Sequence, residues 1–398
     1  MVVVADLGCR GRAQAVQGDA ELREMVRRMM PVVAEAAGLK FKREPLVLRR
    51  SRAQVRDYVI HKFDEDLPPK DLAGLQSALR LFGLIPDSLQ LRSTLIDLLT
   101  EQIAGYYDPD SNALYIPDDI QQTQMRIVVS HELVHALQDQ YVRLDSIITQ
   151  RHANDRRAAA QAILEGQATL AQIPVLMPEQ KPDTFPVGWF WSMRTVMAQQ
   201  QEQMKEFARA PLWLREGLVF PYLGGADFVV WFRRKYFASV LDSMPRSTEQ
   251  ILHPERYAEH DEPTAIVFAA GESGVKWEDG LGEFETRLLF QQHLGDEREA
   301  ANLAAGWDGD RYQVLGAQND VLVWYSVWDD ASAASRFAGG LRRAWEKRRA
   351  DGRTGGGRRA EILQLTVGGR PVVRLVDAPA NWNGWRAIPA IRLSGGGG

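Results

Sequence analysis

Apolar residues recur at helical spacing through most of the first two thirds of the chain. A first helix is expected over 20–37, where the apolar side chains lie one to four positions apart on one face: Leu22, Met25, Val26, Met29 and Met30. Ser51 is of the type that caps helix N-termini, and it predicts a helix of about 15 residues after it. The same spacing predicts further helices over 71–84, 88–104, 122–142 and 154–176.

Extended segments and breaks separate these helices. Leu46–Leu48 predicts a short strand, and the residues around a Pro-Asp-Ser-Asn turn within 105–117 predict a hairpin just before the helix over 122–142. Segment 178–186 contains three prolines and is expected to be a loop. Segment 220–225, Phe-Pro-Tyr-Leu-Gly-Gly, is expected to break a helix that resumes through Tyr236.

A glycine-rich and acidic stretch around 272–282 predicts a domain boundary. Beyond it, strand-like runs at 321–327, 362–367 and 372–376 surround a helix over 331–349, which indicates a small α+β domain with an antiparallel sheet. The expected fold class is therefore α+β. The expected parts are an N-terminal segment (1–19), a mainly helical domain with a small sheet (20–272), a C-terminal α+β domain (273–394) and a flexible tail (395–398).

Composition narrows the class of protein. The 398 residues are 45% hydrophobic and 25% charged, as in an ordinary globular protein, and the net charge of -4 gives no general case for nucleic acid as a partner. No uninterrupted apolar run is long enough to span a membrane. The stretch before Cys9 is too short and too acidic for a signal peptide, so the default expectation is cytoplasmic, with export expected only if a leader was trimmed.

The candidate chemistry lies in the helix expected over 122–142. His131 and His135 are four positions apart, so both imidazoles lie on one helix face and can converge on one ion. Glu132 lies beside them, where a carboxylate can take a proton from water activated by the metal. Because Cys9 is the only cysteine, any zinc must be bound by histidine and carboxylate ligands.

A zinc site of this kind needs a third protein ligand and leaves the fourth position for water. The metzincin pattern would continue with glycine and histidine where this chain has Gln138 and Tyr141, so that class is excluded. The first candidate is Glu165, in the middle of the next expected helix, which an antiparallel pairing would bring to the histidines. The second candidate is Glu216, whose neighbours arginine and glycine suggest an exposed turn.

Together these residues resemble the gluzincin class of zinc metallopeptidases. The motif His131-Glu132-x-x-His135 is followed on the next helix by Glu165-Gly-x-Ala. This resemblance implies a zincin-like catalytic domain, a Zn²⁺ cofactor held by His131, His135 and Glu165, and Glu132 as the general base. It covers about residues 90–260, and the zinc motif is its most specific part.

A second segment is similar to M1-type aminopeptidases. The sequence Pro-Tyr222-Leu-Gly-Gly resembles their Pro-Tyr-x-x-Gly segment, which implies that Tyr222 donates a hydrogen bond to the oxyanion of the tetrahedral intermediate. The chain departs from that pattern in its longer gap between His135 and Glu165. It also lacks the Gly-x-Met-Glu-Asn strand and the large N-terminal sheet domain. It therefore looks closer to the smaller bacterial and archaeal proteins of the peptidase MA type.

Two further assignments concern the surroundings of the motif. By analogy with gluzincins, Ala113–Ile116 is expected either to be an edge strand that pairs with the substrate backbone or to be a plain hairpin packed on the core. His253, in a capped turn near the domain boundary, is expected to be structural.

Three functions remain open from the sequence. The first is an active zinc peptidase with peptide or protein substrates, in which Glu132 removes a proton from water and returns it to the leaving amine. The second is a gluzincin scaffold used for binding or regulation. The third is a zinc hydrolase that acts on another bond, because the same ion and base serve several hydrolyses. The sequence gives no oligomeric state.

Overall fold

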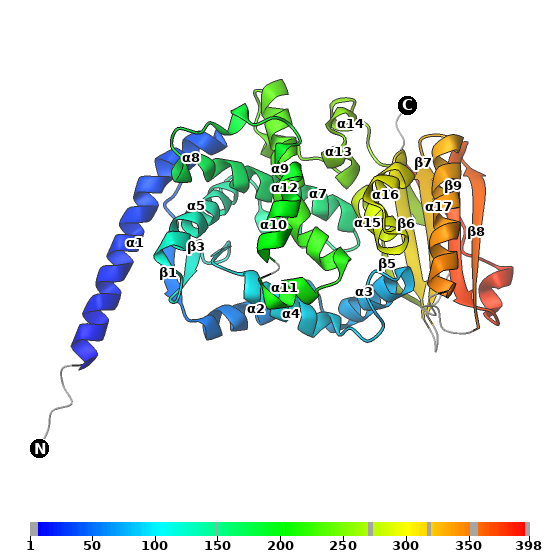
Figure 1. Cartoon of the computed structure of the whole chain (residues 1–398), viewed down its shortest axis with the longest axis horizontal. Coiled ribbons are helices and arrows are strands. Elements are labelled where there is room, and N and C mark those ends of the chain that lie inside the picture. The colour runs from blue at the N-terminus through cyan, green and yellow to red at the C-terminus, as the bar shows by residue number, and fades with distance from the viewer. Residues whose placement is uncertain are drawn as a thin grey trace, which may run out of the picture.

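The computed structural model describes residues 7–148, 150–201, 203–269, 274–316, 320–350 and 357–394. The fold is α+β: a mainly helical part holds most of the N-terminal two thirds, and a five-stranded antiparallel sheet lies at the opposite end of the molecule (Figure 1). The expected boundary at 272–273 and the expected tail over 395–398 lie outside the described residues. Of the expected N-terminal segment, residues 7–19 already form helix with 20–37.

Helices make up most of the N-terminal part. They are α1 (Leu7–Ala37), α2 (Arg52–Asp66), α3 (Pro69–Phe82), α4 (Leu91–Gln102), α5 (Gln122–Gln138), α6 (Leu144–Ile148), α7 (Asn154–Ala171), α8 (Ile173–Leu176), α9 (Trp189–Ser192), α10 (Arg194–Gln201), α11 (Lys205–Arg209), α12 (Leu212–Lys235), α13 (Thr248–Leu252) and α14 (Pro254–Ala258). The expected cap at Ser51 is confirmed, because its side chain accepts from the backbone N–H of Gln54 and the Gln54 side chain accepts from that of Ser51.

The small sheet has the order β1–β3–β2 and comprises β1 (Leu46–Arg50), β2 (Tyr106–Asp108) and β3 (Ala113–Pro117). The expected hairpin is present, with Asn112 in its turn at φ 50°. Of the two alternatives for Ala113–Ile116, the edge strand is wrong, because β3 pairs with β1 on one side and β2 on the other. Both sides of β3 are paired from Ala113 to Tyr115, so this stretch is not an open edge for a substrate backbone.

The expected helix break at 220–225 is also wrong. Helix α12 runs from Leu212 to Lys235 with Pro221 inside it. Proline removes one backbone N–H and crowds the carbonyl four positions earlier, which here belongs to Gly217. Residues on both sides of Pro221 are buried in the core, so tertiary packing overrides the local signal. Tyr222 therefore projects from a helix and not from a turn.

Helices α7 and α12 cross in direct backbone contact at a pair of glycines. A Cβ atom built on Gly166 would lie 2.1 Å from the carbonyl carbon of Gly225, and one built on Gly225 would lie 1.8 Å from the carbonyl oxygen of Ala162. No real side chain fits at such distances, so this approach requires glycine on both helices. The crossing brings Glu165 of α7 and Tyr222 of α12 to the same side of the molecule.

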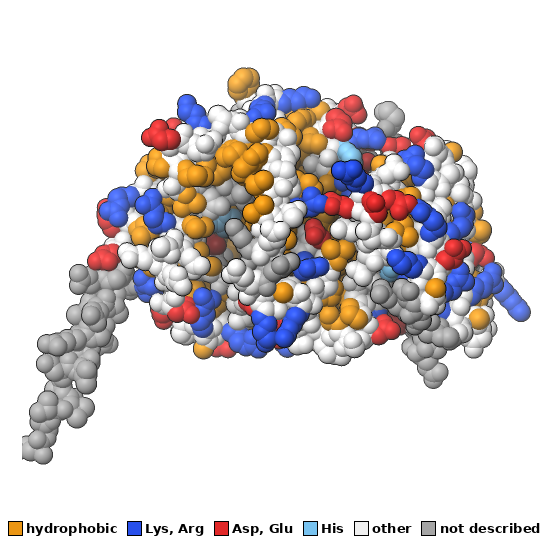
Figure 2. Space-filling model, in the orientation of Figure 1, with side chains coloured by type: hydrophobic (Ala, Val, Ile, Leu, Met, Phe, Trp, Pro, Cys, Tyr) orange, Lys and Arg blue, Asp and Glu red, His pale blue; other side chains and the backbone are white. Residues whose placement is uncertain are grey.

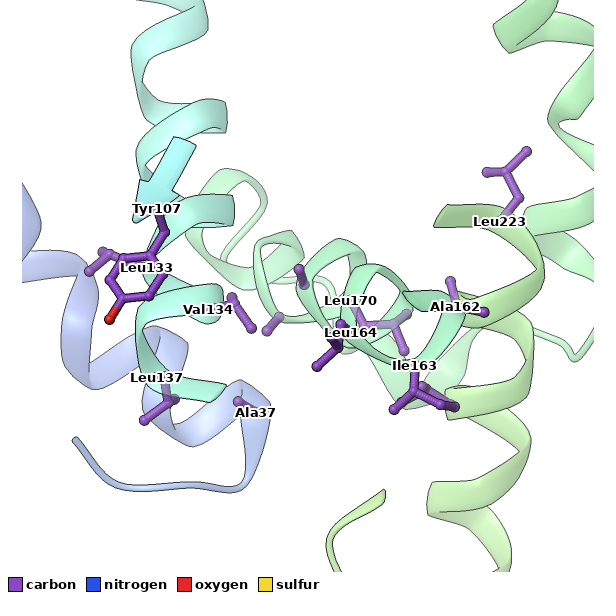
Figure 3. Packing of buried hydrophobic residues seen from close by; sticks show 14 of the residues in the cluster. Ala37, Tyr107, Leu133, Val134, Leu137, Ala162, Ile163, Leu164, Leu170 and Leu223 are labelled. Carbon is purple, nitrogen blue, oxygen red and sulfur yellow. The ribbon is translucent and has the colours of Figure 1, made fainter. Parts of the chain in front are cut away.

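The core of the helical part surrounds α5 and α7. In Figure 3, Val134 of α5 points toward Leu164 of α7, while Leu137 lies beside Ala37 at the end of α1. These side chains are almost completely buried. Burial of this kind fixes the rotation of α5 about its axis, and it therefore fixes the direction of the two motif histidines.

The C-terminal sheet has the order β5–β6–β7–β9–β8 and all its strand pairs are antiparallel. Its strands are β5 (Val275–Asp279), β6 (Trp307–Leu315), β7 (Val321–Trp328), β8 (Arg358–Val367) and β9 (Arg370–Pro379), and its helices are α15 (Gly282–Leu294), α16 (Glu297–Ala304) and α17 (Ala331–Ala350). The helices cover one face (Figure 1). The strand pair β4 (Ala265–Phe268) and β10 (Ile391–Ser394) packs on the other.

Helix α3 shares its core with this C-terminal sheet, although it lies about two hundred residues earlier in the chain. Its Leu79 and Phe82 are buried together with Trp277 and Trp324. The ring of Phe82 lies edge-on to Trp324 at 5.2 Å between centroids. The sheet and the helical part are therefore joined by packing as well as by the chain. Among the described helices, none combines the length and apolar composition needed to cross a membrane.

Candidate metal centre

Three side chains from two helices converge on one point. The Nε2 atom of His131 lies 3.0 Å from Oε2 of Glu165, that of His135 lies 3.5 Å from the same oxygen, and the two Nε2 atoms are 3.2 Å apart. Donors at 2.0–2.1 Å around a tetrahedral zinc ion lie about 3.3 Å from one another. The three donor atoms therefore have the spacing of a zinc ligand set, and this is the metal-compatible cluster found among the described residues.

The charges in the cluster also favour a cation. Burial disfavours the charged form of His135, but the negative charge of Glu165 and its contact outweigh burial and raise the pKa of His135 to about 9. Burial alone would raise the pKa of Glu165, yet His135 and His131 hold it far below its ordinary value. The carboxylate thus keeps its negative charge, and the site is built to hold a positive charge beside it.

A buried amide network orients His135. Its Nδ1 lies 2.9 Å from Oε1 of Gln138, which has no hydrogen to donate, so Nδ1–H is the donor and Nε2 is the atom that would bind a metal once it has lost its proton. The Nε2 group of Gln138 donates to the carbonyl of Leu164 and to Oε1 of Gln167. Gln167 in turn donates to the carbonyl of Ala37. One chain of hydrogen bonds therefore connects α5, α7 and the end of α1, and the residues present fit a zinc ion.

Glu132 and Tyr222 adjoin the cluster, and both line the cavity beside it. The ring of Tyr222 lies 5.7 Å from that of His131, nearly parallel, and 36% of the Tyr222 side chain is exposed. The negative charge of Glu165, together with burial, raises the pKa of Tyr222 well above its usual value. The phenol therefore keeps its proton and is a hydrogen-bond donor at the open side of the cluster.

Comparisons with known proteins do not reach this cluster. A family model described as "Domain of unknown function (DUF8575)" matches residues 273–381, which contain β5 to β9 of the C-terminal sheet. The match covers about a quarter of the chain and includes none of α5, α7 and α12. No curated protein and no solved structure matched the chain. These comparisons therefore assign no function to the cluster.

The two other residues considered from the sequence lie in other environments. Glu216 belongs to α12 and not to an exposed turn, and burial raises its pKa, with the charge of Arg194 acting against this. His253 lies 3.0 Å from Glu283 and contacts Arg287, so it takes part in an ion-pair network on α15. Neither is among the three residues of the metal-compatible cluster.

Sequence reasoning used Gln138 only to exclude the metzincin class and missed its role. The signal was present, because a residue three positions after His135 lies on the same helix face and can reach its ring. The partner Gln167 lies two positions after Glu165 in an apolar stretch of α7, where a polar side chain needs a buried partner. Two glutamines beside two predicted ligands on neighbouring helices were therefore a detectable pattern.

Proposed function

We propose that the protein is a zinc-dependent hydrolase that cleaves peptide bonds. The observation that carries this proposal is the convergence of His131, His135 and Glu165 at tetrahedral spacing, with Glu132 and Tyr222 on their open side. A purely structural zinc site is closed by four protein ligands, whereas this cluster has three among the residues that the structure describes. A cavity large enough for a substrate lies beside the cluster and is lined by His131, Glu132 and Tyr222.

Each residue then has a role that its position supports. His131, His135 and Glu165 would hold the metal, which supplies a Lewis acid for the carbonyl and lowers the pKa of water. Glu132 accepts a proton from the attacking water and delivers it to the leaving amine. Tyr222 donates a hydrogen bond from its phenolic O–H to the carbonyl oxygen, which becomes negatively charged as water attacks the carbonyl carbon.

The metal assignment is tested by metal analysis of the purified protein and three alanine variants. About one zinc per chain is expected in the wild type, and it should be lost in His131→Ala and Glu165→Ala because each removes a ligand. Glu216→Ala is the matched control, since it removes a part-buried carboxylate outside the cluster, and it should retain zinc. Loss of zinc in the control, or retention in both ligand variants, contradicts the site.

The catalytic assignment is tested with Glu132→Gln, which keeps the shape of the side chain but removes the base. The zinc-loaded wild type should cleave peptides, whereas Glu132→Gln should lose at least about 100-fold in kcat with its zinc retained. Equal and negligible turnover in both proteins would instead favour a scaffold used for binding. Tyr222→Phe should lower kcat by about 100-fold, as removal of an oxyanion donor does.

A further inference from the structure

A cavity of about 560 Å³ opens directly beside the metal cluster. Glu132, His131 and Tyr222 form part of its wall, so whatever fills it also touches the reacting groups. Figure 2 shows histidine and acidic side chains at the bottom of a hollow on this face, in the region between α5 and α10. The cavity is therefore continuous with the site of the proposed reaction and is not a separate surface feature.

The rest of the wall is mainly apolar and comes largely from four helices. Helix α2 contributes a face about two turns long, and the end of α4 with the residues just after it, the first half of α5 and the middle of α12 form most of the remainder. The apolar side chains that define it include Val59, Phe63, Leu99, Ile103, Ile127 and Leu218. Covering contiguous apolar surface of this kind with another apolar group removes it from water and lowers the free energy.

The basic side chain in this wall is already engaged. The ammonium group of Lys62 lies 3.1 Å from Asp110 and 3.4 Å from Glu65, so its charge is compensated within the protein. Two acidic residues, Glu132 beside the cluster and Asp66 of α2, also line the cavity. An acidic substrate side chain would therefore meet apolar walls and a like charge, and it would lose its hydration without gaining a free cation.

We propose that this cavity binds the apolar side chain of a substrate residue next to the scissile bond, so that the enzyme cleaves beside large aliphatic or aromatic residues. This inference rests on the proposed function and specifies its substrate class. A difference of one methylene group in an apolar pocket changes specificity by about 10- to 200-fold. Leucine or phenylalanine at this position should therefore be preferred over alanine, aspartate or glutamate by at least about 10-fold.

Ile127 is the best position for a test, because it lines the cavity and yet 46% of its side chain is exposed. A charge placed there should change the wall without unfolding the protein. The matched control is Leu363→Lys, at a position 39% exposed on β8 of the C-terminal sheet. Zinc content and thermal midpoint should be the same in Ile127→Lys, Ile127→Glu, the control and the wild type.

Two readouts separate this inference from the proposed function. The first is binding of fluorescent peptides with leucine, phenylalanine, alanine or aspartate at one varied position to zinc-loaded Glu132→Gln. The second is cleavage of an equimolar library of the same peptides by the wild type. Both should favour the apolar residues, and Ile127→Lys and Ile127→Glu should each weaken binding and kcat/KM by at least about 10-fold for these peptides. Leu363→Lys should leave both unchanged.

The outcomes of the two readouts distinguish the assignment of the cavity from the peptidase proposal. Cleavage without an apolar preference, or a preference that neither Ile127 variant alters, overturns the assignment of the cavity and leaves the peptidase proposal standing. Selective binding that depends on Ile127 but without cleavage supports the cavity and overturns the peptidase proposal. Absence of selective binding in the first readout overturns the assignment of the cavity whether or not the wild type cleaves.

Discussion

At the scale of single residues, Gln138 connects two of the proposed ligands. It accepts from His135 and donates to the carbonyl of Leu164, the residue before Glu165. Gln138→Ala should weaken zinc binding by about 10- to 100-fold, as loss of an outer-shell partner does. It should also lower the free energy of unfolding by about 1–3 kcal/mol, because buried partners lose their hydrogen bonds. Competition with a chromophoric chelator measures the first effect and urea unfolding the second.

The variant Gln138→Glu separates these two roles. It keeps an acceptor for His135 but removes the donor to Leu164 and Gln167. Zinc affinity should therefore stay closer to the wild-type value than in Gln138→Ala, while stability falls. An affinity for Gln138→Ala equal to that of the wild type would show that the amide does not orient the ligand.

Glu249 is a buried carboxylic acid, because the residue is only 2% exposed. Burial, followed by the charge of Glu283, raises its pKa from 4.5 to about 10. Since the pKa in the folded state is raised, this residue's contribution to stability is full below about pH 4.5 and is lost as the pH rises toward 10. Glu249→Gln should therefore gain stability relative to the wild type from pH 5 to 9, by at most about 1.4 kcal/mol per pH unit.

Thermal unfolding across this pH range measures the effect. Glu259→Gln serves as the control, because Glu259 is an exposed glutamate at the end of α14, ten positions later in the chain. Its unfolding curves should follow those of the wild type at every pH. Parallel pH profiles for Glu249→Gln and the wild type would mean that Glu249 is charged in the folded protein.

At the scale of secondary-structure elements, the crossing of α7 and α12 depends on glycine. Gly225→Ala would place a methyl group against the backbone of Ala162 and push the helices apart. Because Glu165 lies beside this crossing, zinc affinity should fall, and overpacking should cost about 1–3 kcal/mol of stability. Isothermal titration with zinc and urea unfolding measure the two effects.

The same helix provides a control for helix propensity. Apart from its neighbours in the chain and the adjacent backbone of its own helix, no atom lies within 4 Å of a Cβ built on Gly217. Gly217→Ala should therefore leave zinc affinity unchanged and stabilise the protein by about 0.5–1 kcal/mol, because alanine favours a helix. If Gly225→Ala behaved in the same way, the close approach of the two helices would not be needed.

The sequence predicted those elements whose signals are local. The cap at Ser51 and the spacing of His131 and His135 are read within one or two turns of helix, and both geometries are present. The convergence of Glu165 followed from pairing two helices that were expected to be successive, although the short helix α6 lies between α5 and α7. Two wrong predictions concern elements whose conformation or pairing is determined by contacts with distant segments of the chain. Pro221 continues a helix because α7 packs against it, and β3 is central because β1, from far earlier in the chain, occupies its second edge.

At the scale of the whole molecule, Phe82 is the residue of α3 that most directly joins the two parts. It is fully buried, and its ring packs edge-on against Tyr312 and Trp324 of the sheet. Phe82→Ala should lower the free energy of unfolding by about 3–5 kcal/mol. Urea unfolding followed by tryptophan fluorescence and by circular dichroism should give one shared transition, shifted to lower urea.

A surface phenylalanine provides the comparison. Phe237 is fully exposed after α12, and Phe237→Ala should leave the midpoint unchanged. Two separate transitions in the wild type, with only one affected by Phe82→Ala, would show that the sheet unfolds independently of the helical part.

The place of α3 in the sheet's core has a consequence during synthesis. The carbonyl of Phe82 accepts from His293, which is 211 positions later in the chain. At about 5–20 residues per second, a ribosome needs roughly 10–40 s to add that length. Throughout this interval the nascent helix carries an apolar face without its partner strands. Prematurely terminated chains should therefore aggregate or recruit chaperones, even though they already contain every side chain proposed to bind zinc.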